Sequence, residues 1–543
     1  MPPSLATVSG GAIGCRAMTY EPGCFSDARP WLVDPAKMPW RANVAELRAE
    51  TQRRLPELVR AKGLPPLDRF AGAGLRLGAA LALWAALESR RAQPESRAAL
   101  SRRLRGAFEK LGPAYIKLGQ IVSSGRGLFP EEVVNEFSSL RDRVPPEPFA
   151  AVRAVVEEDL GRPLEEVFSR FDERSLAAAS IAQVHSARLR SGEEVVVKVQ
   201  RPQVAKLVRS DLRAMAWIAP FLVGRIPIAA LANPPALVEL FAETISEELD
   251  FRLEAENILD IARLLKDAGQ TLLVVPRPHP ELITRRVLVM ERLQGYTLGQ
   301  AEEMRAAGID TAAVLRALLI SFLEGAMIYG VFHGDLHGGN LFVMPDGRVA
   351  LLDFGMTGRM DQKQRVAFMR MMVTGFTNDI PGHLAAFRDL GALPDDADLA
   401  QLSRDLKLDR PPIDPTQLTG EELVSEIQEV LKGLLAHGAR LPKHLMLYVK
   451  DLVFIDGAIG DLAPDVDLFA EVGRLFAYFT ATHGERMARE LGNEGVRVEL
   501  DLTGFKASLG LQAEVETLTH RELLKRREVV RKRLEDASGP ALP

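Results

Sequence analysis

The sequence predicts an α+β fold built in three parts: a helical extension at the N-terminus, a small lobe that contains a β-sheet, and a larger helical lobe. Two observations indicate this order. Short runs with strand character gather between about residues 170 and 295, and helical periodicity, with apolar residues three and four positions apart, prevails before and after them. At roughly 150 residues per domain, the 543 residues allow three or four domains.

The composition excludes several classes of protein. The 68 basic and 73 acidic residues leave a formal net charge of −5, which excludes a strongly basic nucleic-acid binder. Hydrophobic residues at 47% and charged residues at 26% are typical of a globular chain with a large core. Two cysteines, Cys15 and Cys24, are too few for a disulfide-stapled scaffold or a cysteine-rich metal site, and they favour a reducing compartment.

No segment has the pattern expected of a membrane-spanning helix. The uncharged run Leu77–Leu87 would reach about 17 Å, against roughly 30 Å of hydrocarbon. The longer run from Ala214 to Val238 is interrupted by Arg225 and by prolines, which favours a buried or interfacial segment. The N-terminus lacks the basic start and compact apolar stretch of a signal peptide. We therefore expect a cytoplasmic protein, with peripheral contact at the inner face of the membrane left open.

The first third of the chain is predicted to be helical after a flexible lead. Residues 1–40 are rich in Pro, Gly and Ser and show no period, which predicts the lead. Residues 41–165 form the helical extension, with a break at Gly112 and Pro113. Its last amphipathic helix ends at Gly161 and Pro163.

Strands are predicted within the next part, residues 166–295, which also holds a helical insertion. Ser180–Arg190 and Glu194–Val199 have strand character, and the short turn at Ser191 and Gly192 predicts that they form a hairpin. Arg286–Met290 is a further strand.

The remaining residues are mainly helical, as a lobe over 296–500 and a tail over 501–543. A helix is expected across Thr311–Phe332. Two short strands, Leu341–Met344 and Val349–Leu352, follow it and are joined by the turn Pro-Asp-Gly.

The strongest chemical signal is the stretch His333–Asn340, followed at a distance by Leu351–Gly355. Phosphoryl transfer needs a carboxylate near the acceptor and oxygen ligands that hold Mg²⁺ on the phosphates. Asp335 would orient the acceptor or take its proton, and Asn340 and Asp353 would hold the metal. The alternatives are two unrelated turns that each carry a capping Asp, or a zinc site at His333 and His337. Zinc would need both histidines on one helix face, and Gly334, Gly338 and Gly339 indicate a loop.

A lysine and an acidic segment precede that loop in the order a kinase requires. Lys198 stands between β-branched residues in a predicted strand and can reach phosphates if a glutamate fixes its ammonium. On a helix, Asp250 and Glu254 would share one face, with Glu247 near them. Taken alone, an edge-strand lysine and a solvated acidic helix are the simpler interpretations.

Two further stretches are unusual for a kinase. Where a glycine loop would cover the phosphates, the sequence has Ala177, Ala178, Ala179 and Ser180, which would be stiffer and would hold the backbone further away. Upstream, Lys117 and Gln120 in the sequence Lys-Leu-Gly-Gln would point the same way on a helix. Alone, the first could be a hairpin turn and the second a surface feature.

Together these motifs resemble the UbiB/AarF family of atypical kinase-like proteins, which is linked to ubiquinone biosynthesis. The resemblance covers roughly residues 95–360. It implies a protein-kinase-like bilobal fold, with a small β-rich N-lobe and a helical C-lobe, after a family-specific N-terminal helical extension. Its marks are the Lys117–Gln120 motif, residues 128–131 and 140–146, the alanine-rich turn, Lys198, Glu248 with Asp250 and Glu254, His333–Asn340, and Asp353–Gly355.

The resemblance also implies roles for residues and ligands. Lys198 pairs with Glu254 and acts with Asp335 in catalysis, while Lys117 and Gln120 restrict the substrate channel. Asn340 and Asp353 bind Mg²⁺, and the alanine-rich turn alters nucleotide selectivity. The nucleotide implied is ATP or ADP. The further partners implied are enzymes of ubiquinone biosynthesis or a lipid. The expected nucleotide-binding residues are Ala177, Ala178, Ala179, Ser180, Lys198, Glu248, Asp250 and Glu291.

The C-terminus departs from many bacterial members of that family, which end in apolar anchoring helices. Here Arg521–Asp536 carries seven basic residues and an approximate apolar stripe of Leu523, Leu524, Val530 and Leu534. Such a helix could lie on an anionic membrane surface, or it could be a plain solvated terminal helix.

Three functions from different classes remain. The first is a nucleotide-dependent phosphotransferase or ATPase that acts on or near isoprenoid lipid metabolism. The second is a small-molecule kinase of the aminoglycoside or choline kinase type, which shares the pattern around Asp335 and Asn340 but lacks the Lys117–Gln120 and alanine-rich features. The third is a non-catalytic nucleotide-binding scaffold, against which the retained Asp335 argues.

Overall fold

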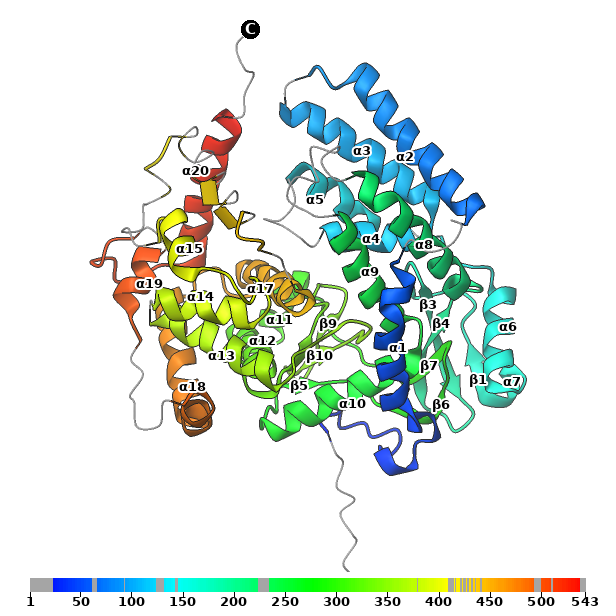
Figure 1. Cartoon of the computed structure of the whole chain (residues 1–543). Helices are drawn as coiled ribbons and strands as arrows, with labels where there is room; N and C mark the ends of the chain where they lie inside the picture. Colours follow the sequence, from blue (N-terminus) through cyan, green and yellow to red (C-terminus); the bar gives the residue numbers. More distant parts are fainter. Residues whose placement is uncertain are drawn as a thin grey trace, which may run out of the picture.

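A computed structural model describes the chain from residue 23 to residue 537 (Figure 1). The description omits residues 61–65, 92, 124–130, 142–144, 223–233, 378, parts of 409–441, 493–499 and 509–510. The features predicted at Cys15, at residues 128–130 and at residues 142–144 therefore lie outside the described residues.

A twisted antiparallel sheet forms the centre of the first half, in the order β1-β3-β4-β7-β6, with β2 paired to β3. Its core is a run of valines on β4 and β7, which α6 covers on one face. The predicted hairpin is confirmed, since β3 and β4 pair in continuous register from Ala182 with Gln200 to Arg188 with Glu194. The strands are β1 (Phe168–Phe171), β2 (Ala177–Ala178), β3 (Ala182–Leu189), β4 (Glu194–Gln200), β6 (Pro278–Ile283) and β7 (Val287–Glu291).

The helical extension precedes this sheet and packs on the helices inserted in it. Gly112 has a left-handed φ of +101° and Pro113 begins the next helix, so the predicted break is confirmed. That helix, α4, is buried on most of its surface between its neighbours. The bounds are α1 (Val44–Leu58), α2 (Leu67–Leu87), α3 (Gln93–Leu111), α4 (Pro113–Ser123), α5 (Glu131–Ser138), η3 (Ser139–Arg141), α6 (Phe149–Leu160) and α7 (Leu164–Val167).

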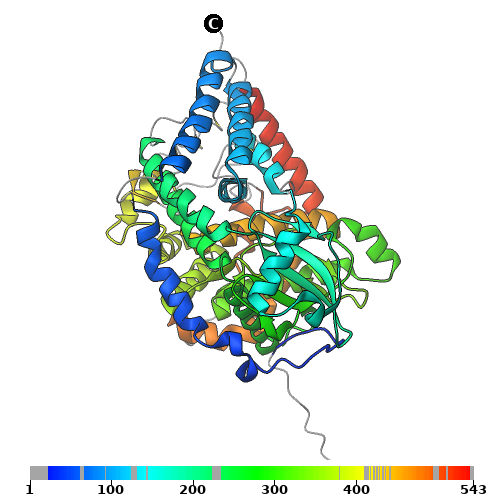
Figure 2. The ribbon, with the colours of Figure 1, turned by 90° about the vertical axis from the view of Figure 1, so that its right-hand side faces the viewer.

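Helix α2 is longer than the eleven apolar residues that the sequence singled out, and it stands at the rim of the molecule (Figures 1 and 2). Because it continues the run toward the N-terminus, its 21 residues are long and apolar enough to cross a membrane. Leu75 on its outer face is 74% exposed. The only other stretch of the described residues that meets the same criterion, Thr311–Tyr329, lies mostly inside the fold.

Residues 23–41, which we term the N-terminal strap, are not the flexible lead that was predicted. The side chain of Phe25 is buried, and its backbone forms an isolated β-bridge with Val275. The indole Nε1 of Trp31 donates to the carbonyl of Pro278 at 3.0 Å. Apolar and aromatic side chains therefore anchor a segment whose Pro, Gly and Ser content suggested disorder. It contains the short helices η1 (Pro35–Lys37) and η2 (Pro39–Arg41).

Three helices are inserted between β4 and β6: α8 (Val204–Leu222), α9 (Pro234–Glu248) and α10 (Phe251–Asp267). The acidic segment was expected to form one helix, and this was wrong. Asp250 has an extended backbone and caps α10 by accepting the backbone N–H of Arg252, so Glu248 and Glu254 lie on different helices.

The second half is helical apart from two small sheets. The expected helix over Thr311–Phe332 ends at Tyr329, because Gly330 turns the chain with a φ of +71° into the next strand. The predicted pair of strands around the Pro-Asp-Gly turn is confirmed as β9 and β10. The remaining strands are β5 (Leu273–Val274), β8 (Val331–His333), β9 (Leu341–Val343), β10 (Val349–Leu351) and β11 (Thr357–Arg359).

The helices of this half surround those strands (Figure 1). Most of them share one hydrophobic core with α10 and the extension, whereas α15 packs with α14 in a separate small cluster. Their bounds are η5 (Leu298–Gln300), α11 (Ala301–Ala306), α12 (Thr311–Glu324), the π-helical turn η6 (Gly325–Tyr329), α13 (Gln362–Phe376), α14 (Ile380–Asp389), α15 (Leu399–Asp405), α17 (Lys443–Leu462), α18 (Leu468–Leu491), α19 (Leu502–Ser508) and α20 (His520–Ala537).

The apolar stripe predicted on the terminal helix is mostly turned toward the protein. Leu523, Val530 and Leu534 are half-buried, whereas Leu524 is 44% exposed. Arg527 of α20 pairs with Asp456 of α17 at 2.5 Å. α20 is therefore held against α17, with most of its apolar stripe half-buried.

Candidate active site

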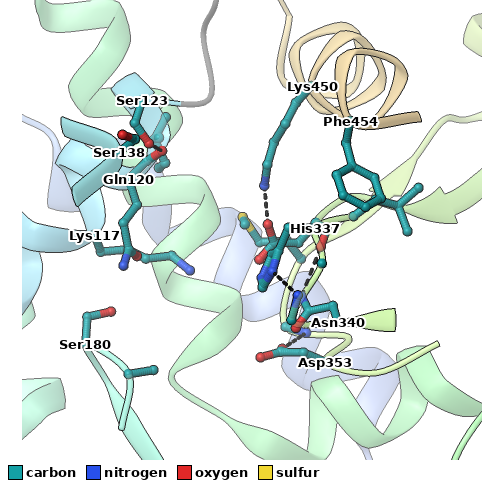
Figure 3. Close-up of a pocket in the computed structure, with 18 of the residues that line it drawn as sticks. Lys117, Gln120, Ser123, Ser138, Ser180, His337, Asn340, Asp353, Lys450 and Phe454 are labelled. Atoms are coloured by element: carbon teal, nitrogen blue, oxygen red, sulfur yellow. Dashed lines mark hydrogen bonds and ion pairs between the residues drawn. The ribbon is translucent and has the colours of Figure 1, made fainter. Parts of the chain in front are cut away.

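A cavity of about 1000 Å³ lies where the main sheet, the extension and the helical part meet (Figure 3). Helices α4 and α5 form one side, the alanine-rich turn and β4 another, and α17 faces them across the loop between β8 and β9. Most of the residues singled out from the sequence are on its walls, namely Lys117, Gln120, Ala177, Ala178, Ala179, Ser180, Lys198, Glu248, Glu254, Asp335, Asn340 and Asp353.

Lys198 connects the sheet to the rest of the site. It stands on β4, and its Nζ lies 2.7 Å from Glu254 Oε1 on α10 and 3.0 Å from Asp353 Oδ1. Burial disfavours the charged ammonium, but the carboxylates of Asp353 and Glu254 outweigh it and raise the pKa of Lys198. The lysine is therefore a fixed positive charge, and the interpretation as an ordinary edge-strand lysine does not hold.

His333 and His337 belong to the loop and do not form a metal pair. The Nε2 of His333 donates to the carbonyl of Leu352 at 2.9 Å, and its Nδ1 accepts the backbone N–H of Asp335. Burial lowers the pKa of His333, in keeping with this neutral ring. His337 accepts the N–H of Gly339. Neither ring nitrogen of His333 is left for zinc.

Asp335 is held from two directions. The amide of Asn340 donates to its backbone carbonyl at 2.9 Å, and its carboxylate pairs with Lys450 of α17. Burial opposes ionisation, but the charges of Lys450 and Lys117 prevail, so the pKa of Asp335 falls below its usual value. Asp335 is thus a carboxylate at neutral pH, ready to accept a hydrogen bond from a hydroxyl group.

Asp353 projects into the same space from the segment after β10. Its Oδ1 accepts the N–H of Gly355 at 3.2 Å, and Figure 3 shows the side chain directly beside Asn340. A Cβ at Gly355 would lie 3.2 Å from Asp353 Oδ1 and 3.4 Å from Glu248 Cγ. A side chain at position 355 would therefore crowd the side chains of both Asp353 and Glu248.

The alanine-rich turn closes the cavity on the sheet side. Ala177 and Ala178 form β2 and pair with β3, and the N–H of Ala179 donates to the carbonyl of Ala182 at 2.8 Å. The guanidinium of Arg201 donates to the carbonyl of Ala179 at 2.9 Å. The turn is therefore held by backbone hydrogen bonds on both sides, which makes it stiffer than an open glycine loop.

The extension reaches the site through α4. Lys117 Nζ lies 2.8 Å from Glu248 Oε1, and the exposed fractions of the two side chains are 12% and 7%. Burial disfavours the charged lysine, but Glu248 and the nearby aspartates raise the pKa of Lys117. The amide of Gln120 donates to the carbonyl of Leu140 at 3.3 Å. A cation from outside the sheet thus occupies the acidic end of the cavity.

Two residues expected at the nucleotide are not on the described cavity walls. The carboxylate of Asp250 binds the guanidinium of Arg252 besides capping α10. Glu291, at the end of β7, accepts hydrogen bonds from Ser26 of the strap and from Arg277. Both side chains thus make intramolecular contacts outside the cavity lining.

The donor set fits Mg²⁺ that is shared with phosphate. Among the described residues, no three Asp, Glu, His or Cys side chains lie close enough to hold a metal ion by themselves. Mg²⁺ usually takes one or two carboxylates and completes its shell with phosphate oxygens and water. Asp353 and the amide oxygen of Asn340 would hold it, and bound Mg²⁺ would neutralise phosphate charge there.

Sequence reasoning missed Lys450 and Asp451. Asp451 is fully buried and accepts the backbone N–H of Leu336, next to Asp335, at 2.9 Å. Both residues come from α17, more than 100 positions after the loop that they hold. No local spacing marks them, because α17 also carries Lys443, Asp456 and Asp461, and nothing in its sequence sets Lys450 and Asp451 apart from these charges.

Comparison with known proteins is consistent with this kinase-like geometry. Residues 139–384 match the family described as the ABC1 atypical kinase-like domain. An uncharacterized protein of Mycobacterium tuberculosis is 36% identical over 377 residues, covering 68% of this chain and 76% of the relative. An aarF domain-containing protein kinase of Arabidopsis thaliana, described as uncharacterized and chloroplastic, is 32% identical, covering 68% and 73%.

A probable protein kinase UbiB of Pseudomonas aeruginosa is also 32% identical, covering 68% of this chain and 69% of the relative. A solved Mycobacterium tuberculosis structure, described as a complex with erythromycin, gives a TM-score of 0.37 at 22% identity, covering 64% of this chain and 91% of that chain. The chain belongs to the UbiB/aarF family of ABC1 atypical kinase-like proteins.

Proposed function

We propose that this protein is an atypical kinase or ATPase that binds ATP with Mg²⁺ and transfers the terminal phosphoryl group to an acceptor. In this proposal the main sheet is the N-lobe and the surrounding helices are the C-lobe of a bilobal kinase fold. The observation that carries the proposal is the position of Lys198, which bridges Glu254 and Asp353 in the cavity that also holds Asp335 and Asn340.

Each residue then has a role that its surroundings support. Lys198 binds the inner phosphates while Glu254 keeps its ammonium in place. Asp335, ionised and facing the cavity, orients an acceptor hydroxyl or water and takes its proton. The alanine-rich turn covers the nucleotide, and Lys117 with Gln120 narrows the way in for a large substrate.

The pathway we propose is ubiquinone or isoprenoid lipid metabolism, since relatives are named UbiB. Peripheral contact with the inner face of a membrane would suit a lipid acceptor. The exposed apolar face of α2 supports such contact better than α20, whose stripe is mostly half-buried.

The decisive experiment measures phosphate release from ATP by the purified chain with Mg²⁺, with and without anionic liposomes. Asp335→Asn is the matched variant, because it keeps the size of the side chain and removes its charge. We expect release that needs Mg²⁺, rises with liposomes and falls about 100-fold or more in the variant. Equal release by both proteins would contradict the role of Asp335.

A nucleotide-binding scaffold is the second candidate, because Lys117 already neutralises Glu248 at the acidic end of the cavity. A scaffold requires nucleotide binding without turnover. The scaffold function would be favoured if Asp335→Asn binds nucleotide normally and neither protein releases phosphate under any of these conditions.

A further inference from the structure

Lys450 places a positive charge beside Asp335. This lysine belongs to none of the motifs found in the sequence. Its ammonium pairs with the Asp335 carboxylate, and Figure 3 shows it reaching down from α17 into the cavity. The exposed fractions of the Lys450 and Asp335 side chains are 11% and 18%. The pair therefore lies within the cavity, unlike the solvent-screened ion pairs of a protein surface.

The neighbouring residue fixes this lysine relative to the catalytic loop. The Oδ1 of Asp451 accepts the N–H of Leu336 at 2.9 Å, and the Asp451 side chain has no exposed area. Adjacent residues of one helix thus hold the loop by its backbone and by its aspartate. Any movement of the loop would carry Asp335 and the end of Lys450 together.

The distribution of charge in the cavity shows what this cation is suited for. The described walls include three lysines and no arginine. Lys198 is paired with Glu254 and Asp353, and Lys117 with Glu248. Lys450 is the cation next to the residue that would face the acceptor. A phosphoryl group transferred to an acceptor at Asp335 would therefore lie next to this cation.

We propose that Lys450 is a further catalytic residue, which binds the terminal phosphoryl group of ATP and balances its charge during transfer; this rests on the proposed function. In the transfer, the bond from the terminal phosphorus to the bridging oxygen breaks and its electron pair stays with ADP. The acceptor oxygen forms the new bond to phosphorus, and its proton passes to Asp335. The ammonium of Lys450 contacts both Asp335 and the phosphoryl oxygens. It supplies positive charge to the group in transfer, which is the role of an arginine finger in other phosphoryl-transfer enzymes.

The test compares the affinities of ADP and of a non-hydrolysable ATP analogue, each with Mg²⁺, by calorimetry on the full chain. Lys450→Gln should weaken binding of the analogue about tenfold or more and change ADP binding by less than about twofold, because one charge-assisted contact is lost. Lys450→Arg should retain the preference for the triphosphate. Lys443→Gln is the matched control and should alter neither affinity, because this similarly buried lysine of α17 pairs with Glu243 and Glu247 away from the cavity.

Turnover supplies a second readout, and we expect it to fall about 100-fold or more in Lys450→Gln. An unchanged ratio of the two affinities, or equal losses for both nucleotides, would overturn the inference while leaving the proposed function standing. If Lys450→Gln does not fold, Lys450→Met is the replacement, because it keeps the apolar stem of the side chain. The ratio of its affinities for the ATP analogue and ADP then tests the inference in the same way. Failure of the unaltered chain to bind either nucleotide would overturn the proposed function, and this inference with it.

Discussion

Asp353 has a backbone φ of +54°, in the left-handed region that residues with a side chain seldom adopt. Such a conformation costs of the order of 1–3 kcal/mol and persists where surrounding contacts impose it. Here Lys198 and the N–H of Gly355 both bind its carboxylate. Burial opposes ionisation, but the charge of Lys198 outweighs it and lowers the pKa of Asp353. The residue is thus held as a carboxylate aimed at the cavity.

Asp353→Asn should abolish stabilisation of the protein by ATP with Mg²⁺, because an amide is a much weaker ligand for Mg²⁺ than a carboxylate. At a ligand concentration of 100 times Kd, binding stabilises a protein by about 2.7 kcal/mol, and we expect most of this to disappear. The measurement is the Tm with and without Mg·ATP. Asp346→Asn, at the exposed turn before β10, is the control. An undiminished shift in Asp353→Asn would remove this residue from the metal site.

Residues within short motifs could be placed from the sequence, and residues brought in by tertiary structure could not. Lys198, Asp335 and Asp353 stand at spacings that a strand and a loop impose, and the structure gathers them as expected. Lys450 comes from a distant helix. Glu291 was expected at the nucleotide, but its carboxylate accepts hydrogen bonds from Ser26 of the strap and from Arg277, which no local pattern indicates.

The same limit applies to elements. The hairpin of β3 and β4 follows from strand periodicity and a short turn, both of which are local. The N-terminal strap was misjudged because Pro, Gly and Ser raise the expected disorder, while the anchoring pockets for Phe25 and Trp31 are supplied by residues more than 200 positions away. The break at Asp250 was missed although Asp is a favoured N-cap residue.

The alanine-rich turn is the element most directly open to test. Ala178→Gly removes the side chain that stiffens β2, at a cost of about 0.5–1 kcal/mol in stability. We expect several-fold higher autophosphorylation, measured as incorporation of labelled phosphate, because the loosened turn can approach the phosphates. Ala187→Gly, in the buried part of β3 away from the cavity, should lower stability without this gain. Unaltered incorporation in Ala178→Gly would count against the argument from stiffness.

The contact of the strap with β6 should depend on pH through His279. Its ring packs on Trp31, and its Nδ1 accepts the N–H groups of Glu281 and Leu282 at 3.1 Å, which requires an unprotonated nitrogen. Burial lowers the pKa of His279 to about 4. Since the pKa is about 6.5 in an unfolded chain, the stabilisation is complete above pH 6.5 and is lost as the pH falls through 4.

Tm measurements from pH 7.5 to pH 4 would test this. Over this range the free energy of unfolding of the unaltered chain should fall by up to about 3 kcal/mol more than that of His279→Asn. Asparagine can accept a backbone N–H but does not titrate. Parallel curves for the two proteins would show that the ring does not need to stay neutral.

At the scale of the whole molecule, a buried ion pair attaches the extension to the inserted helices. Arg69 of α2 binds Asp211 of α8 through two hydrogen bonds of 2.5 and 2.9 Å, and Asp211 is fully buried. Burial raises the pKa of Asp211, while Arg69 opposes that rise. This pair holds the two helices in register, and a buried charge left without its partner is costly.

Arg69→Ala should therefore lower the free energy of unfolding by about 3–5 kcal/mol, as measured by denaturant titration. The double variant Arg69→Met with Asp211→Leu should be much less destabilised, since neither charge then remains buried alone. If the double substitution instead costs as much as the two single substitutions added together, the two charges are not coupled and the pair contributes little to the attachment of α2.

The strap also has a mechanical consequence for the molecule. It contacts two of the sheets, since Trp31 binds the backbone of β6 in the main sheet while Asp27 pairs with Arg348 in the β9–β10 turn at 2.9 Å. Only four positions along the chain separate the two attachments. Rocking of one sheet against the other would pull directly on this tether. If the two sheets must separate to exchange the nucleotide of the proposed function, a chain begun at residue 42 should exchange it faster than the intact chain.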